Sequence, residues 1–334
     1  MTGSDPLDAG AESSADDGLS ADDVLSADDG LYADDVLSAD DVLSAGGAVQ
    51  GASPERPARS SDPERRPPRV DRPRVTIVSP HFDDAPLSLG QSLLDGALRG
   101  ARVRVVVVFG RTNFTRWFHP TRGRAVPTSI WRRSEELAAQ AAFHYRVRTA
   151  RWEELVLRTG ELDPATLLDP NAPLDQHLLD GLVTWLRRLR GDGSTVLFPG
   201  GLGDHMDHRL VAAAGRRLMA EHPDRLGFYE DRPYASLLEQ STLTAAMVAL
   251  AAESAEPDAS TSASSTVPLT SMVPTEVSGP VTVRLHTLLQ RCYPSQIDDL
   301  FRSAMDRDLA AGARERVWFA AGECPSWLRR GGDG

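Results

Sequence analysis

Short β-branched runs alternate with longer helical patterns along this chain from residue 74 onward. The expected strands are residues 75–78, 103–109, 195–198, 226–229 and 281–283. The expected helices are residues 87–98, 129–143, 178–190, 208–220, 284–292 and 295–305. This alternation is typical of a parallel sheet, and the valine-rich run at 103–109 indicates a strand buried on both faces. The sequence therefore predicts a Rossmann-like α/β fold with a mostly parallel sheet flanked by helices.

A polar motif, Ser-Pro-His-Phe-Asp-Asp at residues 79–84, follows the first expected strand directly. In an open α/β sheet, ligands bind beyond the carboxyl ends of the strands. Adjacent residues in an extended segment point in different directions. One of Asp83 and Asp84 can therefore bind a metal beside His81 while the other faces the open side of the metal. Taken alone, the motif is equally consistent with a helix-capping loop whose histidine is incidental.

A second polar motif, Gly-Gly-Leu-Gly-Asp-His-Met-Asp-His at residues 200–208, follows the strand at 195–198 and opens a helix. His205 and His208 are three residues apart, so they share one face of that helix. The two strand-end motifs can meet across the top of the sheet. Together they supply two histidines and a carboxylate, the ligand set of an open catalytic zinc site.

At these residues the sequence resembles the PIG-L/LmbE family of zinc-dependent N-deacetylases, in its actinobacterial branch. The matching elements are residues 80–84 and 205–208, with weaker matches at Tyr-Glu-Asp-Arg-Pro-Tyr (229–234) and Tyr-Pro-Ser-Gln (293–296). The family often has Glu after the two aspartates, whereas this chain has Ala85. That departure leaves the ligands in place and weakens any inference about the sugar that is bound.

The resemblance implies a role for each residue of the two motifs. It makes one zinc ion the cofactor, with other divalent metals possible, and the ligands His81, Asp84 and His208. It makes Asp83 the general base, His205 the electrophilic or acid partner, and Asp207 the residue that orients His205. A helix first-turn acid is the alternative for Asp207. The implied substrate is a small molecule, an N-acetylated or N-acylated amino sugar or its conjugate.

These roles fit the hydrolysis of an amide. Zinc lowers the pKa of its bound water to about 7 and polarises the acyl carbonyl. Asp83 would take the proton of the water, and His205 would stabilise the oxyanion and protonate the leaving amine. The sequence therefore predicts a zinc-dependent N-deacetylase that acts on linear amide C–N bonds.

Further strand-end residues are candidates for contact with the substrate. Arg111 follows the second expected strand, and the strand at 226–229 is followed by Glu230, Asp231 and Tyr234. Arg132 and Glu135, by contrast, are expected to form an ordinary pair on a helix surface.

The N-terminal part of the chain has a different composition from the rest. Residues 1–46 hold 13 acidic side chains and no basic one, and Ala-Asp-Asp recurs there every six residues. A dense block of like charge is typical of disorder. We therefore expect a disordered acidic tail and a Pro/Arg-rich linker over residues 1–72, and a catalytic domain over 73–330. Residues 252–279, rich in Ala, Ser, Thr and Pro, are expected to be a flexible insertion.

Charge and apolar content bear on partners and location. The 36 basic residues all lie outside the acidic segment, which leaves 35 acids beside them and argues against a nucleic-acid partner. Cys292 and Cys324 suggest neither a disulfide scaffold nor a structural zinc site. There is no secretory signal and no run of 18 apolar residues, so we expect a cytoplasmic protein without a membrane partner. Oligomeric state cannot be deduced from these features.

Two other functions fit parts of the pattern. His81, Asp83 and His208 match the facial triad of non-haem Fe(II) oxygenases, although those enzymes generally use an all-β jelly-roll scaffold. A catalytically silent Rossmann-like binding module is the other alternative. The Gly-x-Gly-x-x-Gly turn of dinucleotide-binding proteins is missing after the first strand, which argues against that module.

Overall fold

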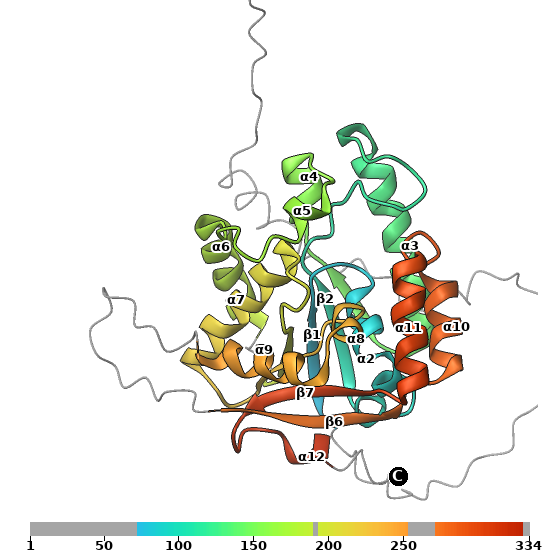
Figure 1. Ribbon diagram of the computed structural model, residues 1–334. Helices are drawn as coiled ribbons and strands as arrows, with labels where there is room; N and C mark the ends of the chain where they lie inside the picture. The colour runs from blue at the N-terminus through green and yellow to red at the C-terminus, as the bar shows by residue number, and fades with distance from the viewer. Residues whose placement is uncertain (1–71, 190–192, 253–270, 330–334) are drawn as a thin grey trace, which may run out of the picture. The chain divides into compact units, whose positions relative to one another are not determined.

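Seven strands of the described residues form one sheet in the order β3-β2-β1-β4-β5-β7-β6. The computed structural model describes residues 72–189, 193–252 and 271–329 (Figure 1). The strands are β1 (Arg74–Ser79), β2 (Arg102–Val107), β3 (Arg146–Thr149), β4 (Thr195–Pro199), β5 (Leu226–Tyr229), β6 (Met272–Pro280) and β7 (Arg314–Ala320). Strands β1 to β5 run parallel to one another. Strand β7 pairs antiparallel with β5, and β6 pairs antiparallel with β7. The predicted α/β fold with a mostly parallel sheet is confirmed.

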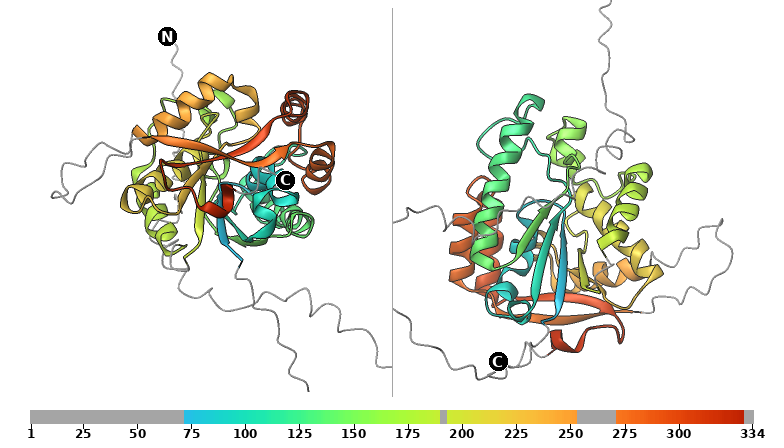
Figure 2. Two further views of the ribbon diagram at one scale, coloured as in Figure 1. Left: turned by 90° about the horizontal axis from the view of Figure 1, so that it is seen from below. Right: turned by 180° about the vertical axis from the view of Figure 1, so that it is seen from behind.

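Helices cover both faces of the sheet. The longer helices are α2 (Asp84–Leu94), α3 (Ala125–Phe143), α6 (Gln176–Arg187), α7 (Met206–Glu221), α9 (Gln240–Ala252), α10 (Val283–Cys292) and α11 (Asp299–Ala311). Leu93, Phe143 and Leu285 bury α2, α3 and α10 in one hydrophobic cluster, while α6, α7 and α9 pack in a second cluster. Figures 1 and 2 show these two groups of helices on opposite sides of the strands. None of the helices in the described ranges is both long and apolar enough to cross a bilayer.

The order of the strands identifies the place where a ligand would bind. From β1 the sheet grows through β2 to β3 in one direction, and β4 and β5 lie on the other side of β1. The carboxyl ends of β1 and β4 therefore flank the point at which the strand order reverses. In doubly wound sheets the crevice at this point is the usual ligand site. Both polar motifs of the sequence follow these two strands.

Several expected element boundaries differ from the observed ones. Helix α3 begins at Ala125 rather than at Ser129, whose hydroxyl instead bonds to the backbone of Thr112. Helix α11 begins at Asp299, after its N-cap Asp298, and not at residue 295. Strands β3, β6 and β7 and helix α9 were not predicted. The expected strand at 281–283 is wrong, because Thr282 is the N-cap of α10 and Val283 begins that helix. The short helices α4 (Leu155–Thr159), α5 (Pro164–Leu167), α8 (Tyr234–Leu237) and α12 (Ser326–Arg329) and the 3₁₀ turns η1 (Ala97–Gly100) and η2 (Arg122–Arg124) complete the assignment.

The expectation of a flexible insertion at 252–279 is wrong for its last eight residues, which belong to β6. This strand contains Pro274 and Pro280, and it pairs with β7 alone, so it lies at the edge of the sheet. Proline is tolerated at an edge because the missing N–H is not needed on the open side. The Ala/Ser/Thr/Pro-rich composition that predicts a flexible insertion therefore also fits the edge strand β6. Residues 253–270 and the predicted tail and linker, up to residue 71, lie outside the described ranges, and the domain division stays a prediction.

Helix α2, which carries the first motif, is interrupted at Leu89, where φ is −131° and ψ is 16°. The break releases two backbone N–H groups of the following turn. The buried carboxylate of Glu315 on β7 accepts both of them, from Gln91 and from Ser92, each at 2.7 Å. Glu315 thus caps the second half of the helix across the sheet, as an acid at a helix N-terminus does.

We predict that Glu315→Ala lowers the free energy of unfolding by about 2 to 4 kcal/mol, because it leaves two buried N–H groups without an acceptor. Urea unfolding followed by circular dichroism measures the change. The matched control is Glu276→Ala in the neighbouring strand, an exposed carboxylate paired with Arg314 at 3.2 Å. That control should change the free energy by less than about 0.5 kcal/mol. Equal stability of the two variants would contradict the capping role.

Candidate active site

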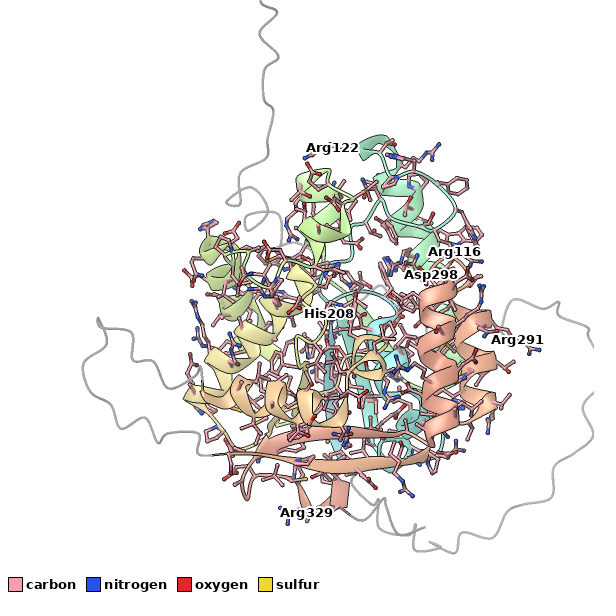
Figure 3. All side chains as sticks on the ribbon, in the orientation of Figure 1. Arg116, Arg122, His208, Arg291, Asp298 and Arg329 are labelled. Atoms are coloured by element: carbon pink, nitrogen blue, oxygen red, sulfur yellow. The ribbon has the colours of Figure 1, made fainter. Side chains whose placement is uncertain are left out.

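The two polar motifs meet at the carboxyl ends of β1 and β4. His81 and Asp83 lie in the turn between β1 and α2, and Asp84 opens that helix. His205 is the N-cap of α7, and His208 lies in its first turn. Figure 3 labels His208, which lies centrally between the two groups of helices. The loop before α7 needs glycine, since Gly203 has a φ of 78° and an added Cβ would overlap the ring of Tyr234.

Three donor atoms converge on one point. Oδ2 of Asp84 lies 3.2 Å from Nδ1 of His81 and 3.3 Å from Nε2 of His208. With metal–ligand bonds of about 2.0 to 2.2 Å, neighbouring ligands of a tetrahedral zinc ion stand about 3.3 Å apart. The separations and the chemistry of these donors therefore fit a tetrahedral metal ion. A second group of donors within 4.8 Å of one another, His81, His205 and Asp207, shares one of these residues.

Each of the two converging histidines has a carboxylate on its other nitrogen. Oδ2 of Asp207 lies 3.1 Å from Nε2 of His81, and Oδ1 of Asp231 lies 2.7 Å from Nδ1 of His208. A carboxylate in this position fixes the tautomer and leaves the facing nitrogen as an acceptor for a metal. Asp207 and Asp231 therefore orient the candidate ligands.

The expected partnership of Asp207 with His205 is not observed. The buried carboxylate of Asp207 bonds to His81, to Nη2 of Arg158 at 2.7 Å and to the backbone N–H of Leu155 at 2.9 Å. His205 instead accepts the backbone N–H of Asp207 at its Nδ1, at 3.2 Å. The difference arises because His205 is the N-cap, so its ring turns toward the free N–H groups of the helix.

The electrostatics of the site favour positive charge at the converging donors. Although burial opposes it, the neighbouring carboxylates of Asp84 and Asp231 raise the pKa of His208 to about 9. The pKa of His81 is also raised, with Asp84 and Asp207 outweighing burial. Burial would raise the pKa of Asp84, but His208 and His81 outweigh this effect and hold it well below its usual range. A divalent cation supplies the charge that this arrangement favours.

His205 has the opposite character. Burial, reinforced by the nearby His81 and His208, lowers the pKa of His205 to about 3, so its imidazole is neutral at pH 7. Its position at a helix N-terminus also disfavours a positive charge. Because Nδ1 accepts the N–H of Asp207, the proton of the neutral ring is on Nε2. His205 therefore offers an N–H donor.

Asp83 lies beside the ligands and has a cationic partner. Its Oδ1 accepts a hydrogen bond from Nη2 of Arg132 at 2.7 Å. Burial raises the pKa of Asp83, and Arg132 opposes that effect. The expectation that Arg132 and Glu135 form a surface pair is wrong, since both are buried and Glu135 bonds to Ser295 instead. The 19-residue helix α3 buries one face, and these residues are on it.

Glu154 is a site residue that sequence reasoning missed. It is buried 3.9 Å from Nε2 of His81 and 4.0 Å from Nη1 of Arg132. Its Oε2 has no hydrogen-bond partner among the described residues, although the atom is buried. Glu154 follows β3, whose sequence Arg-Val-Arg-Thr lacks the apolar run that reveals a buried strand. A strand-end assignment of β3 would have placed Glu154 beside the other candidates.

Comparisons with known proteins found a relative that is named as a deacetylase. The chain is 34% identical over 186 residues to the 2'-N-acetylparomamine deacetylase of Streptomyces fradiae, a match that covers 53% of this chain and 63% of that protein. The match thus spans less than two thirds of the relative. No family model matches the chain. The predicted resemblance to the PIG-L/LmbE deacetylases is confirmed.

Solved structures of deacetylases are also similar to this chain. A teicoplanin-pathway deacetylase in complex with teicoplanin has a TM-score of 0.49 at 20% identity and covers 74% of this chain and 97% of its own. The A40926 pseudoaglycone deacetylase has a TM-score of 0.46 at 20% identity, with 75% and 97% covered. The N,N'-diacetylchitobiose deacetylase of Pyrococcus horikoshii has a TM-score of 0.39 at 15% identity, with 72% and 77% covered.

The candidate substrate residues divide into two groups. Asp231 and Tyr234 are at the cluster, with the ring of Tyr234 5.6 Å from that of His208. Glu230 instead bonds to Trp318 and Arg316 on β7, because neighbouring residues of an extended segment face opposite ways. Arg111 forms a partly exposed ion pair with Glu153 at 2.9 Å. Contact of any of the four with substrate stays a prediction.

We predict that Asp231→Asn weakens metal binding about 10- to 100-fold, because His208 loses the carboxylate that orients it. Competition with a chromogenic chelator measures the affinity. The neighbouring Glu230→Gln is the matched control and should leave the affinity unchanged, since Glu230 faces β7. Equal losses in both variants would show that the effect is one of general destabilisation.

Proposed function

We propose that this protein is a metal-dependent hydrolase that removes an N-acetyl or N-acyl group from an amino sugar or an amino-sugar conjugate. The observation that carries the proposal is the convergence of His81, Asp84 and His208 on one point, with the free carboxylate of Asp83 and the neutral His205 beside it. The similarity to an N-acetylparomamine deacetylase supports the reaction and the substrate class. Zinc is the default metal for two histidines and one carboxylate.

His81, Asp84 and His208 would hold one zinc ion per chain. When bound, zinc supplies a water of pKa about 7 and polarises the acyl oxygen. Asp83 is placed to take the proton of that water. Its Oδ1 is engaged by Arg132, which fixes the carboxylate and leaves Oδ2 for the proton. Burial keeps water from competing for this carboxylate.

His205 suits the stabilisation of charge on the acyl oxygen better than the donation of a proton to the amine. A neutral imidazole with its proton on Nε2 is a hydrogen-bond donor, and a buried donor aimed at a developing oxyanion stabilises it. The leaving amine then receives its proton from Asp83, which gained one from the water. The reaction therefore does not require His205 to be protonated.

Glu154 and Arg132 provide the polar contacts that an amino sugar needs. Oε2 of Glu154, which has no hydrogen-bond partner among the described residues, can accept a hydrogen bond from a sugar hydroxyl, and this removes the cost of a buried acceptor without a donor. Arg132 holds the general base and faces the same carboxylate. We infer that these two residues line the sugar subsite, with Tyr234 beside His208 at its wall.

The oxygenase alternative is disfavoured by the geometry. Its triad requires His81, Asp83 and His208, whereas the atoms that converge with the two histidines belong to Asp84. Asp83 bonds to Arg132 instead. The scaffold is also a mostly parallel α/β sheet rather than a jelly roll.

We predict opposite outcomes for the two neighbouring aspartates. Asp84→Asn should lose most of the bound metal, because a ligand is replaced by a neutral amide. Asp83→Asn should keep the metal and lose about 10²- to 10⁴-fold in kcat, because only the base needs a free carboxylate. Elemental analysis and a deacetylation assay over N-acetylamino sugars measure both. Near-normal kcat in metal-bound Asp83→Asn would exclude the base role.

We predict that His205→Ala keeps its metal and loses about 10²- to 10³-fold in kcat, roughly 3 to 4 kcal/mol, with a smaller change in KM. Because the ring acts as a neutral donor, this loss should be the same across the neutral pH range. His205→Gln retains an N–H donor and serves as the control, with partial recovery of kcat. A loss that disappears for substrates with an activated leaving group would instead identify His205 as the acid.

A further inference from the structure

One buried acid and two tyrosine hydroxyls form a cluster that contacts the backbone of the first motif. Glu136 of α3 is fully buried, with Oε1 2.7 Å from the hydroxyl of Tyr145 and Oε2 2.6 Å from the hydroxyl of Tyr293. The hydroxyl of Tyr293 is also 3.2 Å from the backbone oxygen of Phe82. Phe82 stands between His81 and the proposed base Asp83, so this contact reaches the centre of the motif.

The backbone oxygen of Phe82 lies outside the hydrogen-bond ladder of α2. Asp83 is the N-cap of this helix, and its own oxygen accepts the first helical N–H, from Leu87 at 3.0 Å. Phe82 precedes the N-cap, and the residue four positions later is Pro86, which has no N–H to offer. The hydroxyl of Tyr293 is placed to donate to this oxygen instead.

The two contacts of Tyr293 cannot both be hydrogen bonds if Glu136 is ionised. A tyrosine hydroxyl has one proton to donate, and both a carboxylate and a carbonyl oxygen only accept. If Glu136 carries a proton, it donates to the oxygen of Tyr293. The single proton of Tyr293 is then free for Phe82. The contacts of Tyr293 with Glu136 and with Phe82 are both hydrogen bonds only in this protonated arrangement.

We propose that the proton on Glu136 lets Tyr293 hold the backbone oxygen of Phe82, and so keeps His81 and Asp83 in their working positions. When Glu136 ionises, the proton of Tyr293 turns to the carboxylate and the Phe82 oxygen loses its donor. Glu136 and Tyr293 are positioning residues, which touch neither substrate nor metal. The effect on turnover rests on the proposed deacetylase function, whereas the effect on the Phe82 peptide does not.

The surroundings of Glu136 favour the protonated acid around neutral pH. Burial raises the pKa of Glu136 to about 8, although the hydroxyls of Tyr293 and Tyr145 oppose the shift. Asp83 raises this pKa further and Arg132 lowers it. Arg132 is already paired with Asp83, and no cation lies within ion-pair distance of Glu136 among the described residues. Cys292 is a further titratable group near Glu136, and burial raises the pKa of its thiol.

The sign of the pH dependence follows from this arrangement. Below about pH 8 the acid is protonated and the Phe82 oxygen has its donor. Above that pH the donor is lost, and kcat should fall as the motif loosens. Glu136→Gln should remove this fall, because the amide donates to Tyr293 and accepts from Tyr145 at every pH. Tyr293→Phe should lower kcat about 10- to 10²-fold at neutral pH, since small misplacements of reacting groups have effects of this size.

The sequence allows the Phe82 peptide to be observed directly. Phe is followed by Asp only once, at residues 82–83. Protein labelled with ¹³C at the phenylalanine carbonyl and ¹⁵N at aspartate therefore gives one correlated signal in full-length protein. We expect its carbonyl shift to titrate with a midpoint near pH 8 in the wild type and to stay constant in Glu136→Gln.

The kinetic arm compares kcat and KM against pH in the wild type, Glu136→Gln and Tyr293→Phe. Glu315→Gln is the matched control, because burial also raises the pKa of Glu315 to about 8 while its carboxylate bonds to the other half of α2. That control should keep the wild-type alkaline limb. A Phe82 signal that does not change with pH in the wild type, or an alkaline limb that persists in Glu136→Gln, would overturn the proposal.

The two hypotheses fail in different ways. The protein could lack turnover of N-acetylamino sugars at every pH and still show a Phe82 signal whose titration Glu136→Gln abolishes. That result would refute the proposed deacetylase function and support the proposed role of Glu136. Turnover with a Phe82 signal that is insensitive to pH would do the reverse. If Glu136→Gln does not fold, Tyr293→Phe decides the matter, since its Phe82 signal should not titrate near pH 8.

Discussion

The structure depends on the burial of charged and polar groups at the point where β1 and β4 end. Asp83, Asp84, Asp207, Asp231 and Glu154 are all buried there. Buried carboxylates are costly unless each has a partner. Histidines and arginines supply most of these partners, and the cluster still favours added positive charge. A divalent cation would supply that positive charge.

The partners of these groups come from distant parts of the chain. Asp207 joins α7 to α4 through Leu155 and Arg158, and Arg132 joins α3 to the first motif. Asp231 reaches His208 from the end of β5. Each contact serves folding and chemistry together, because the hydrogen bond that satisfies a buried atom also fixes the orientation of a reacting group.

Side chains from distant parts of the chain also support the first motif and the helix that follows it. Phe82 lies before the N-cap of α2, and the hydroxyl of Tyr293, the C-cap of α10, is placed to donate to its backbone oxygen. At Leu89 the helix is interrupted, and Glu315 from β7 accepts the released N–H groups. The start of helix α2 and its interruption are thus both held by side chains from far along the chain.

The sequence alone determined the fold class and most strands, because strand periodicity is a local property, and the family resemblance of its two motifs supplied the candidate ligands. It missed β3, β6 and β7, and the polar sequence of β3 and the prolines of β6 are acceptable only at particular places in a finished sheet. It also missed Arg132 and Glu154, and it assigned Asp207 to the wrong histidine. Only the tertiary structure decides such pairings, since a buried charge finds its partner across packed elements and no local pattern records which one it will be.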